Sequence, residues 1–209
     1  MHSFQILFAG FGLNYLTVVM IDVALGLIRD SLNEHFRNEF SISENKVVLS
    51  NIIRADGSAA QNVDGKIVFF LVSLDEEATL KNSLNRSLGQ ANGSFAVKSP
   101  ALHLNMQVLF CANFDSAIYS EGLSYLSSLI RFFQNNKRMA MDQSENPDAA
   151  KNRLVFELCK LDYAELSHLW SAIGSKLMPS VLYKVSMLVL EDSPIRKIIP
   201  AVKETDNHS

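Results

Sequence analysis

Three consecutive carboxylates, Asp75, Glu76 and Glu77, are the side chains in this sequence best suited to chemistry. They follow an almost continuous apolar run, residues 66–74, which predicts a buried strand that ends at the acidic cluster. Adjacent carboxylates can bind a cation or activate a water molecule, and His103 could act as a base or a ligand. One hypothesis is therefore an α+β enzyme or ligand-binding domain that uses these four residues.

Other motifs that carry chemistry are missing from the sequence. It contains no nucleophile elbow, no HExxH and no cluster of His and Cys residues at metal-ligand spacing. Gly57 and Gly65 do not have the spacing of a phosphate-binding loop, and no Ser or Thr follows Lys66. We therefore favour a solvated strand end, or a charged subunit contact, for the carboxylates. We expect no catalytic residues, no metal ligands and no cofactor.

The composition is that of a soluble protein with one sizeable core. Of the 209 residues, 48% are apolar and 20% are charged, and the net charge is −3. Nucleic acid is not an expected partner, because no run of Lys or Arg could neutralise a phosphate backbone. Cys111 and Cys159 lie in strand-like runs, where we expect them to pack as small hydrophobic residues in a reducing compartment.

The first nineteen residues are apolar and contain no Lys or Arg. They lack the positive region and cleavage site of a signal peptide, and Asn14 and Asp22 interrupt a membrane helix. Two interpretations stay open: residues 1–19 precede a true start at Met20, or they are a genuine hydrophobic extension. A further hypothesis is a membrane-associated anchor formed by residues 4–19. We expect a folded domain over residues 20–192 and a flexible tail over residues 193–209.

The clearest elements lie near the C-terminal end. Residues 153–161 and 181–191 alternate as strands, and residues 163–177 between them form an amphipathic helix. Asp162 and Glu165 predict a capping box at the start of this helix. The second strand is apolar on one face and half apolar on the other, so we expect it to be covered on both sides. The apolar face of the helix has four members: Leu166, Leu169, Trp170 and Ile173.

The remaining elements are two helices and three strands. Strands are predicted over residues 46–53, 66–74 and 101–114, and residues 136–152 are a predicted loop. The helix over residues 21–40 has an apolar stripe of Ile21, Leu25, Ile28, Leu32 and Phe36. The helix over residues 116–135 has inward positions at Ile118, Leu123, Leu126, Ile130 and Phe133. The pattern predicts the α+β class, with helices packed on a mainly antiparallel sheet of about five strands.

Several stretches resemble one known family. They are LDYAELSHLWSAIGSKLMPSVLYKVSML (residues 161–188), FFLVSLDEEATLKN (69–82), ALHLNMQVLFCANF (101–114), YSEGLSYLSSLIRFFQNN (119–136) and MIDVALGLIRDSLNEHF (20–36). The sequence resembles the N-terminal domain family of the sheath-terminating cap proteins of phage-tail-like contractile injection systems. The resemblance covers residues 20–192, and the C-terminal region of longer members is not matched.

The resemblance implies a structural cap, or tail terminator, with a tail-terminator-like fold and no enzymatic activity. Such a cap binds the last ring of sheath and inner tube and stops polymerisation. The implied partners are further copies in a ring, as a hexamer, together with the sheath and inner-tube proteins; no membrane is expected. The implied location is the cytoplasm during assembly, as part of the particle. Sheath subunits of this class are joined by added strands, so a cap with its own sheet could accept them.

Four residues are candidates for the protein interface. They lie in or beside the second half of the strand–helix–strand stretch: Trp170, Met178, Pro179 and Tyr183. Trp and Tyr are favoured at the centre of interfaces, but packing inside the domain is the interpretation that we prefer for all four.

Overall fold

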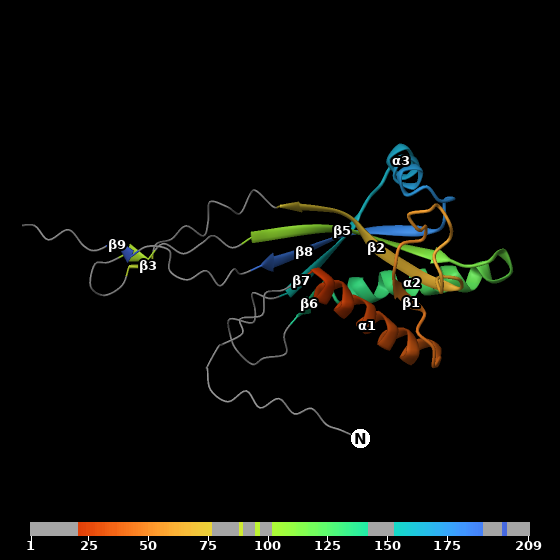
Figure 1. Cartoon of the computed structure of the whole chain (residues 1–209). Helices are drawn as coiled ribbons and strands as arrows, with labels where there is room; N and C mark the ends of the chain where they lie inside the picture. The colour runs from red at the N-terminus through yellow and green to blue at the C-terminus, as the bar shows by residue number, and fades with distance from the viewer. Residues whose placement is uncertain are drawn as a thin grey trace, which may run out of the picture.

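A six-stranded mixed sheet, with helices on both faces, organises the computed structural model of this chain (Figure 1). The structure describes residues 21–76, 88–89, 95–96, 102–141, 153–189 and 198–199. The elements are α1 (Ile21–Phe40), β1 (Val47–Leu49), β2 (Lys66–Glu76), β3 (Leu88–Gly89), β4 (Phe95–Ala96), β5 (Leu102–Asn113), the 3-10 helix η2 (Ser116–Ile118), α2 (Tyr119–Asn135), β6 (Arg138–Ala140), β7 (Arg153–Cys159), α3 (Tyr163–Ile173), β8 (Ser180–Val189) and β9 (Ile198–Ile199).

The strand order in the large sheet is β1-β2-β5-β8-β7-β6. Only β1 and β2 run parallel, and every other neighbouring pair is antiparallel. The two-residue strands β3, β4 and β9 form a second, three-stranded sheet. The predicted α+β class with a mainly antiparallel sheet is confirmed. The predicted extension 1–19, most of the tail 193–209 and the exact domain limits fall outside the described residues, so these stay predictions.

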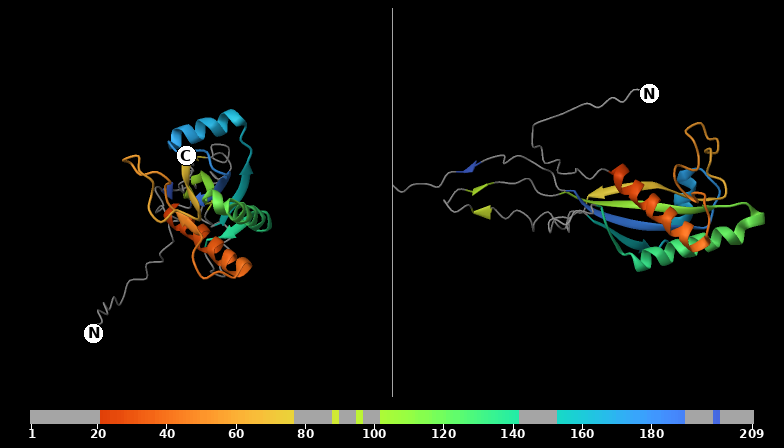
Figure 2. Two further views of the ribbon diagram at one scale, coloured as in Figure 1. Left: turned by 90° about the vertical axis from the view of Figure 1, so that its right-hand side faces the viewer. Right: turned by 90° about the horizontal axis from the view of Figure 1, so that it is seen from below.

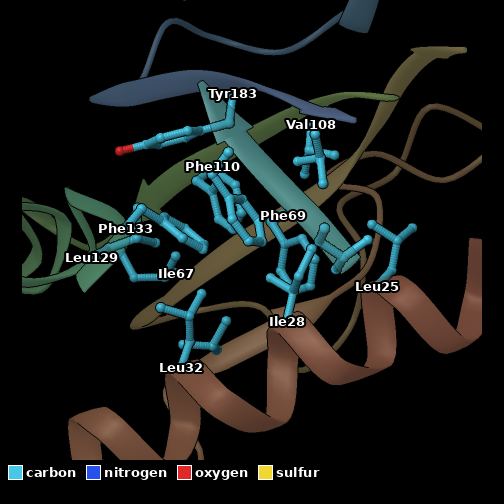
Figure 3. Close-up of a cluster of buried hydrophobic side chains, with 14 of the residues drawn as sticks. Leu25, Ile28, Leu32, Ile67, Phe69, Val108, Phe110, Leu129, Phe133 and Tyr183 are labelled. Atoms are coloured by element: carbon cyan, nitrogen blue, oxygen red, sulfur yellow. The ribbon is translucent and has the colours of Figure 1, made fainter. Parts of the chain in front are cut away.

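The larger core lies between the sheet and the pair α1 and α2 (Figure 3). Phe69 of β2 stacks on Phe110 of β5 with ring centroids 5.0 Å apart, and Phe133 of α2 stacks on Phe156 of β7 at 4.4 Å. Aromatic side chains bury large apolar areas, and stacked pairs add to that stabilisation. The predicted stripe of α1 is confirmed, because its members pack into this core: Leu25, Ile28, Leu32 and Phe36 are buried and Ile21 is partly buried.

A second, smaller core lies on the opposite face of the sheet, beneath α3 (Figure 2). Trp170 packs there against strand residues that include Phe70, Leu109 and Leu182, and Ile52 and Val63 from the β1–β2 connection complete the cluster. The side chains that cover this face therefore come from one short helix, from Leu161 and Met178 on either side of it, and from the β1–β2 connection. The expectation that strand 181–191 is covered on both sides is confirmed for Leu182 and Tyr183, which belong to different cores.

The capping box of α3 is present as predicted. The amide of Glu165 donates to Asp162 Oδ1, and the amide of Asp162 donates to Glu165 Oε2, each at 2.8 Å. The helix ends at Ile173 rather than at residue 177, because Gly174 adopts the left-handed conformation, with φ of +76°, that ends many helices. Strand β1 is shorter than the predicted range 46–53, because the chain leaves the sheet after Leu49.

Two predictions about α2 and the chain after it are wrong. Ile118 and Leu123 are exposed, because the buried face is centred on Tyr125, Leu126, Leu129 and Phe133. Gly122 helps to determine which face of α2 is buried, because it lies against Phe114 in the segment that leads into the helix. Residues 136–152, predicted as a loop, include strand β6 at the edge of the sheet. Three residues are too few to show a two-residue period.

Gly122 and Gly26 form a matched pair for testing the contact with α2. A Cβ atom on Gly122 would lie 2.7 Å from Phe114 Cδ2, whereas a Cβ atom on Gly26 of α1 would meet nothing within 4 Å. We expect Gly122→Ala to lower the free energy of unfolding by about 1 kcal/mol, because the clash outweighs the gain in helix propensity. Gly26→Ala should raise it by about 0.5–1 kcal/mol. Chemical denaturation measures both, and equal stabilisation by the two variants would contradict the close approach.

Candidate protein interface

The four interface candidates from the sequence lie in different environments. Trp170 and Tyr183 are each 3% exposed, and they belong to the cores on opposite faces of the sheet. Met178 and Pro179 are half-buried at the surface. The indole Nε1 of Trp170 is buried without a hydrogen-bond partner among the described residues. The interior packing of the two aromatic residues agrees with the interpretation preferred from the sequence, and an interface role for the four residues stays a prediction.

The acidic cluster does not form a compact site in the described structure. Asp75 pairs with Asn105 and Glu76 with Leu104 across the β2–β5 ladder, so their side chains point to opposite faces of the sheet. Glu77 lies outside the described residues. His103 is half-buried, and its Nε2 has no partner within the described structure. No group of three His, Cys, Asp or Glu residues in the described ranges could hold a metal ion.

A polar cluster between α1 and α2 escaped the sequence analysis. Ser128 Oγ donates to Glu39 Oε2 at 2.7 Å, Arg131 donates to the other carboxylate oxygen, and His35 Nε2 lies 2.9 Å from both Ser128 Oγ and Glu39 Oε2. In a catalytic triad the carboxylate and the serine contact different nitrogens of the histidine. Here both contact the same nitrogen, so the cluster is a polar link between two helices. His35 and Glu39 on α1 are separated in sequence by 89 to 93 residues from their partners Ser128 and Arg131 on α2, which hides the cluster from pattern analysis.

The electrostatics of the described residues indicate structural roles. Burial opposes ionisation of Glu39, but the hydrogen bonds from Ser128 and Arg131 prevail and lower the pKa of its carboxyl group. Burial raises the pKa of the Cys111 thiol, and burial is also the main cause of the raised pKa of Cys159. Both cysteines are free thiols that pack against the smaller core, as predicted. A raised thiol pKa makes a cysteine a poor nucleophile.

A groove separates α3 from the outer edge of β2. Its walls include Leu169 and Ile173 of α3 and Ile53 of the β1–β2 connection, and its volume is about 330 Å³. Val72 lines the groove and is 37% exposed, and Leu74, two residues further along the same strand, is 42% exposed. Apolar side chains left accessible beside a strand edge are typical of a surface that binds another protein.

A second hollow lies on the outer side of α3. Tyr163 and Leu177 line it and are 83% and 60% exposed, and Trp170 also contributes to its wall. The start of α2 is a third apolar surface, with Ile118, Tyr119 and Leu123 exposed. The described structure therefore has three candidate contact surfaces. Of the four interface residues chosen from the sequence, only Trp170 lines one of them.

The sequence matches one family over most of its length. The Pvc16 N-terminal domain family matches residues 26–204. A search of curated proteins finds no match.

Two solved structures have a similar fold. A cryo-EM structure of the anti-feeding prophage cap, described as the AFP tube terminating cap, has a TM-score of 0.57 and 15% identity, over 91% of this chain and 62% of the cap chain. The PVC sheath/tube terminator of an extracellular contractile injection system, in its extended state, has a TM-score of 0.56 and 15% identity, over 93% of this chain and 67% of that chain. This chain therefore spans less than two thirds of the AFP cap.

The hypothesis of a membrane anchor concerns residues 4–19, which lie outside the described residues. None of the helices in the described ranges has the length and apolar character needed to cross a membrane.

The Glu39 cluster predicts a pH-dependent contribution to stability. We expect Glu39→Gln to lower the free energy of unfolding at pH 7 by about 1 kcal/mol, because charge-assisted bonds to Ser128 and Arg131 are lost. The pKa of Glu39 is lowered in the folded state, so its contribution is present above the ordinary glutamate pKa and is lost as the pH falls through the lowered value. Denaturation of both proteins from pH 7 downward should show a difference that persists to the ordinary glutamate pKa of about 4.3 and disappears as the pH falls further.

Glu34→Gln is the control, since Glu34 is an exposed glutamate of the same helix. It should change stability by less than about 0.5 kcal/mol at any pH. A difference between Glu39→Gln and the wild-type chain that does not vary with pH would contradict the assignment.

Proposed function

The chain belongs to the Pvc16 N-terminal domain family, and from this membership we propose that it is a structural cap protein of a contractile injection system. In this role it binds the last ring of sheath and tube and stops their polymerisation. The observation that carries the proposal is the fold match, over 91% and 93% of the chain, to two proteins described as a tube terminating cap and a sheath/tube terminator. The cluster around Glu39 lacks the geometry of a catalytic triad, and the carboxylates of Asp75 and Glu76 point to opposite faces of the sheet. Both observations fit a protein that acts by binding.

The mechanism that we propose is geometric. A stack of rings grows because every ring has two complementary faces, one for each neighbour. A terminator binds through one face and offers no complement on the other. In this chain the apolar contact surfaces lie near α3, at the edge of β2 and at the start of α2. The outer side of α1 and α2 is mainly charged or hydroxylated, with exposed Asp30, Glu34, Arg37, Ser124, Ser127 and Arg131.

That contrast assigns different roles to the two sides of the molecule. Exposed charged side chains lose hydration on burial and are depleted at interface centres. Apart from the apolar residues Ile118, Tyr119 and Leu123 at the start of α2, the α1–α2 side therefore suits the face that accepts no further ring. The side that carries α3 suits the ring-binding face. Met178 and Pro179 lie at the surface, and Met178 packs against the smaller core that contains Trp170. We retain both, together with Trp170 and with Tyr183 from the core on the opposite face, as candidate interface residues.

The proposed partners are further copies of this chain in a hexameric ring, and the sheath and inner-tube proteins of the particle. Assembly takes place in the cytoplasm. The part of the AFP cap that this chain does not match, more than a third of that protein's length, could carry contacts of its own, so the proposal covers capping by the matched domain.

Deletion of the gene for this chain tests the proposal. We expect particles without it to have sheaths and tubes of irregular and often greater length, because nothing blocks addition of further rings. Electron microscopy of negatively stained particles measures the length distribution. Expression of the full chain from a plasmid should restore a narrow distribution, and sheaths of normal, uniform length in the deletion strain would refute the assignment.

A further inference from the structure

We propose that the two opposite edges of the six-stranded sheet bind each other in neighbouring copies of this chain, with Arg138 of one copy beside Asp75 of the next. The partner is a second copy, in a head-to-tail arrangement. The inference rests on the proposed function for the assembly of copies into a ring, and it names the two surfaces and the ion pair that join them. The outlines, the charges and the apolar residues of the edges carry it.

The outlines of the two edges are complementary. β1 pairs only with residues 67–69, so β2 is the outermost described strand over residues 71–76. On the other edge β6 pairs only with residues 153–155, so β7 is outermost over residues 157–159. β1 therefore projects at one end of the sheet and β6 projects at the other end, on the opposite edge. In two copies placed side by side, β6 of one faces the recess beside β2 of the next.

A row of paired residues across the sheet joins Asp75 to Arg138. Asp75 pairs with Asn105, Asn105 with Ser186, Ser186 with Val155, and Val155 with Arg138. Paired residues direct their side chains to the same face of a sheet, so the two charges lie on one face at opposite ends of the row. In a second copy moved sideways by the width of the sheet, Asp75 continues the row next to Arg138.

The charges of the two edges are opposite. Arg138 and Arg153 are exposed at the β6–β7 edge, and Asp75 is exposed at the β2 edge. None of these three side chains forms an ion pair within the described ranges. The carboxylate of Glu157 on β7 is held by Lys184, with Oε2 2.7 Å from Nζ, so it does not neutralise the arginines. Opposite charges at an interface attract the correct partner and fix its register.

Exposed apolar side chains accompany the charges on both edges. Val72 and Leu74 are exposed on β2, and Val155 and Leu158 are exposed on β7. Burial of apolar area supplies affinity, and charges set partner choice. Each edge therefore has the two components of a protein interface, and only the sign of the charge differs between them.

This difference in sign favours a head-to-tail contact. Two β2 edges would bring the carboxylates of Asp75 and Glu76 against each other, and two β6 edges would oppose Arg138 and Arg153 in the same way. A contact between unlike edges repeats from copy to copy and generates a ring when the rotation closes. It also leaves both faces of the sheet available, one for the last ring of the particle and one for solvent.

Charge reversal in the full chain tests the contact by sedimentation velocity over a series of concentrations. We expect the wild type to form assemblies of more than two copies, and Asp75→Arg or Arg138→Asp each to weaken association about tenfold or more. An equimolar mixture of the two variants should return to within about threefold of wild type, because every contact then joins opposite charges. Restoration also shows that both variants fold.

Glu34→Arg is the matched control, because Glu34 is an exposed carboxylate on the outer side of α1. It should leave association within about twofold of wild type, since exposed charges outside the contact contribute little.

Cross-linking decides the matter if copies assemble only on the particle. Arg138→Lys keeps the charge and supplies an amine that a carbodiimide can join directly to a carboxylate. Within one chain, positions 75 and 138 are four strand spacings apart, about 19 Å, which is too far for a direct bond. A peptide that links Asp75 to position 138 therefore comes from two copies. We expect it in the full chain bound to sheath–tube particles from the deletion strain, and Arg37→Lys on α1 should give no link to Asp75.

The outcomes separate this inference from the proposed function. If the wild type associates and both reversed variants associate equally well, the inference is overturned, whereas the sheath-length result still stands. Absence of the linked peptide in both free and particle-bound chains overturns it too, as does a link from Asp75 to a sheath or tube peptide in its place. If deletion of the gene leaves sheath length uniform, the proposed function fails, and association of the free chain alone decides whether the edges bind each other.

Discussion

The structure depends on one constraint. In each of the three central strands, two consecutive apolar residues must be buried, one on each face of the sheet. Phe69 and Phe70 of β2, Leu109 and Phe110 of β5, and Leu182 and Tyr183 of β8 are consecutive pairs in neighbouring strands. One member of each pair enters the core under α1 and α2, and the other enters the core under α3. Because successive residues of a strand point to opposite faces, neither layer of helices can be removed without exposing aromatic and leucine side chains to water.

This constraint explains which parts of the fold the sequence could predict. The stripe of α1, the capping box of α3 and the two-faced strand β8 are local patterns, and the structure has all three. The phase of α2 depends on the contact of Gly122 with Phe114 from outside the helix, so the spacing of its apolar residues misplaced Ile118 and Leu123. The three-residue strand β6 is defined by its pairing with β7, and its own residues carry too little pattern to predict it. Strand β1 was predicted, but over too long a range, because its length depends on where its pairing with β2 stops.

The candidate interface shows the same limit. Trp170 and Tyr183 were selected because large aromatic residues are common at interfaces, but the same property makes them common in cores, where both lie. The accessible apolar residues include Tyr163, Leu177, Val72 and Leu74, which are of the same residue types as many buried ones. Tyr163 and Leu177 are exposed because they lie at the start of α3 and just beyond its end. Val72 and Leu74 are exposed because β1 stops pairing with β2 at Phe69. The edge of β2 can be recognised only when its partners in the sheet are known, because pairing joins residues far apart in the chain.

The position of β8 has a consequence for biosynthesis. It is the last of the six strands to leave the ribosome, yet it lies between β5 and β7 at the centre of the sheet. Until it emerges, β5 lacks the neighbour with which it forms ten residue pairs, and the nascent protein exposes a long strand edge. The sheet therefore closes only after translation of nearly the whole domain. A chain interrupted before residue 180 would lack a central strand, and chaperones would have to shield the exposed β5 edge from aggregation.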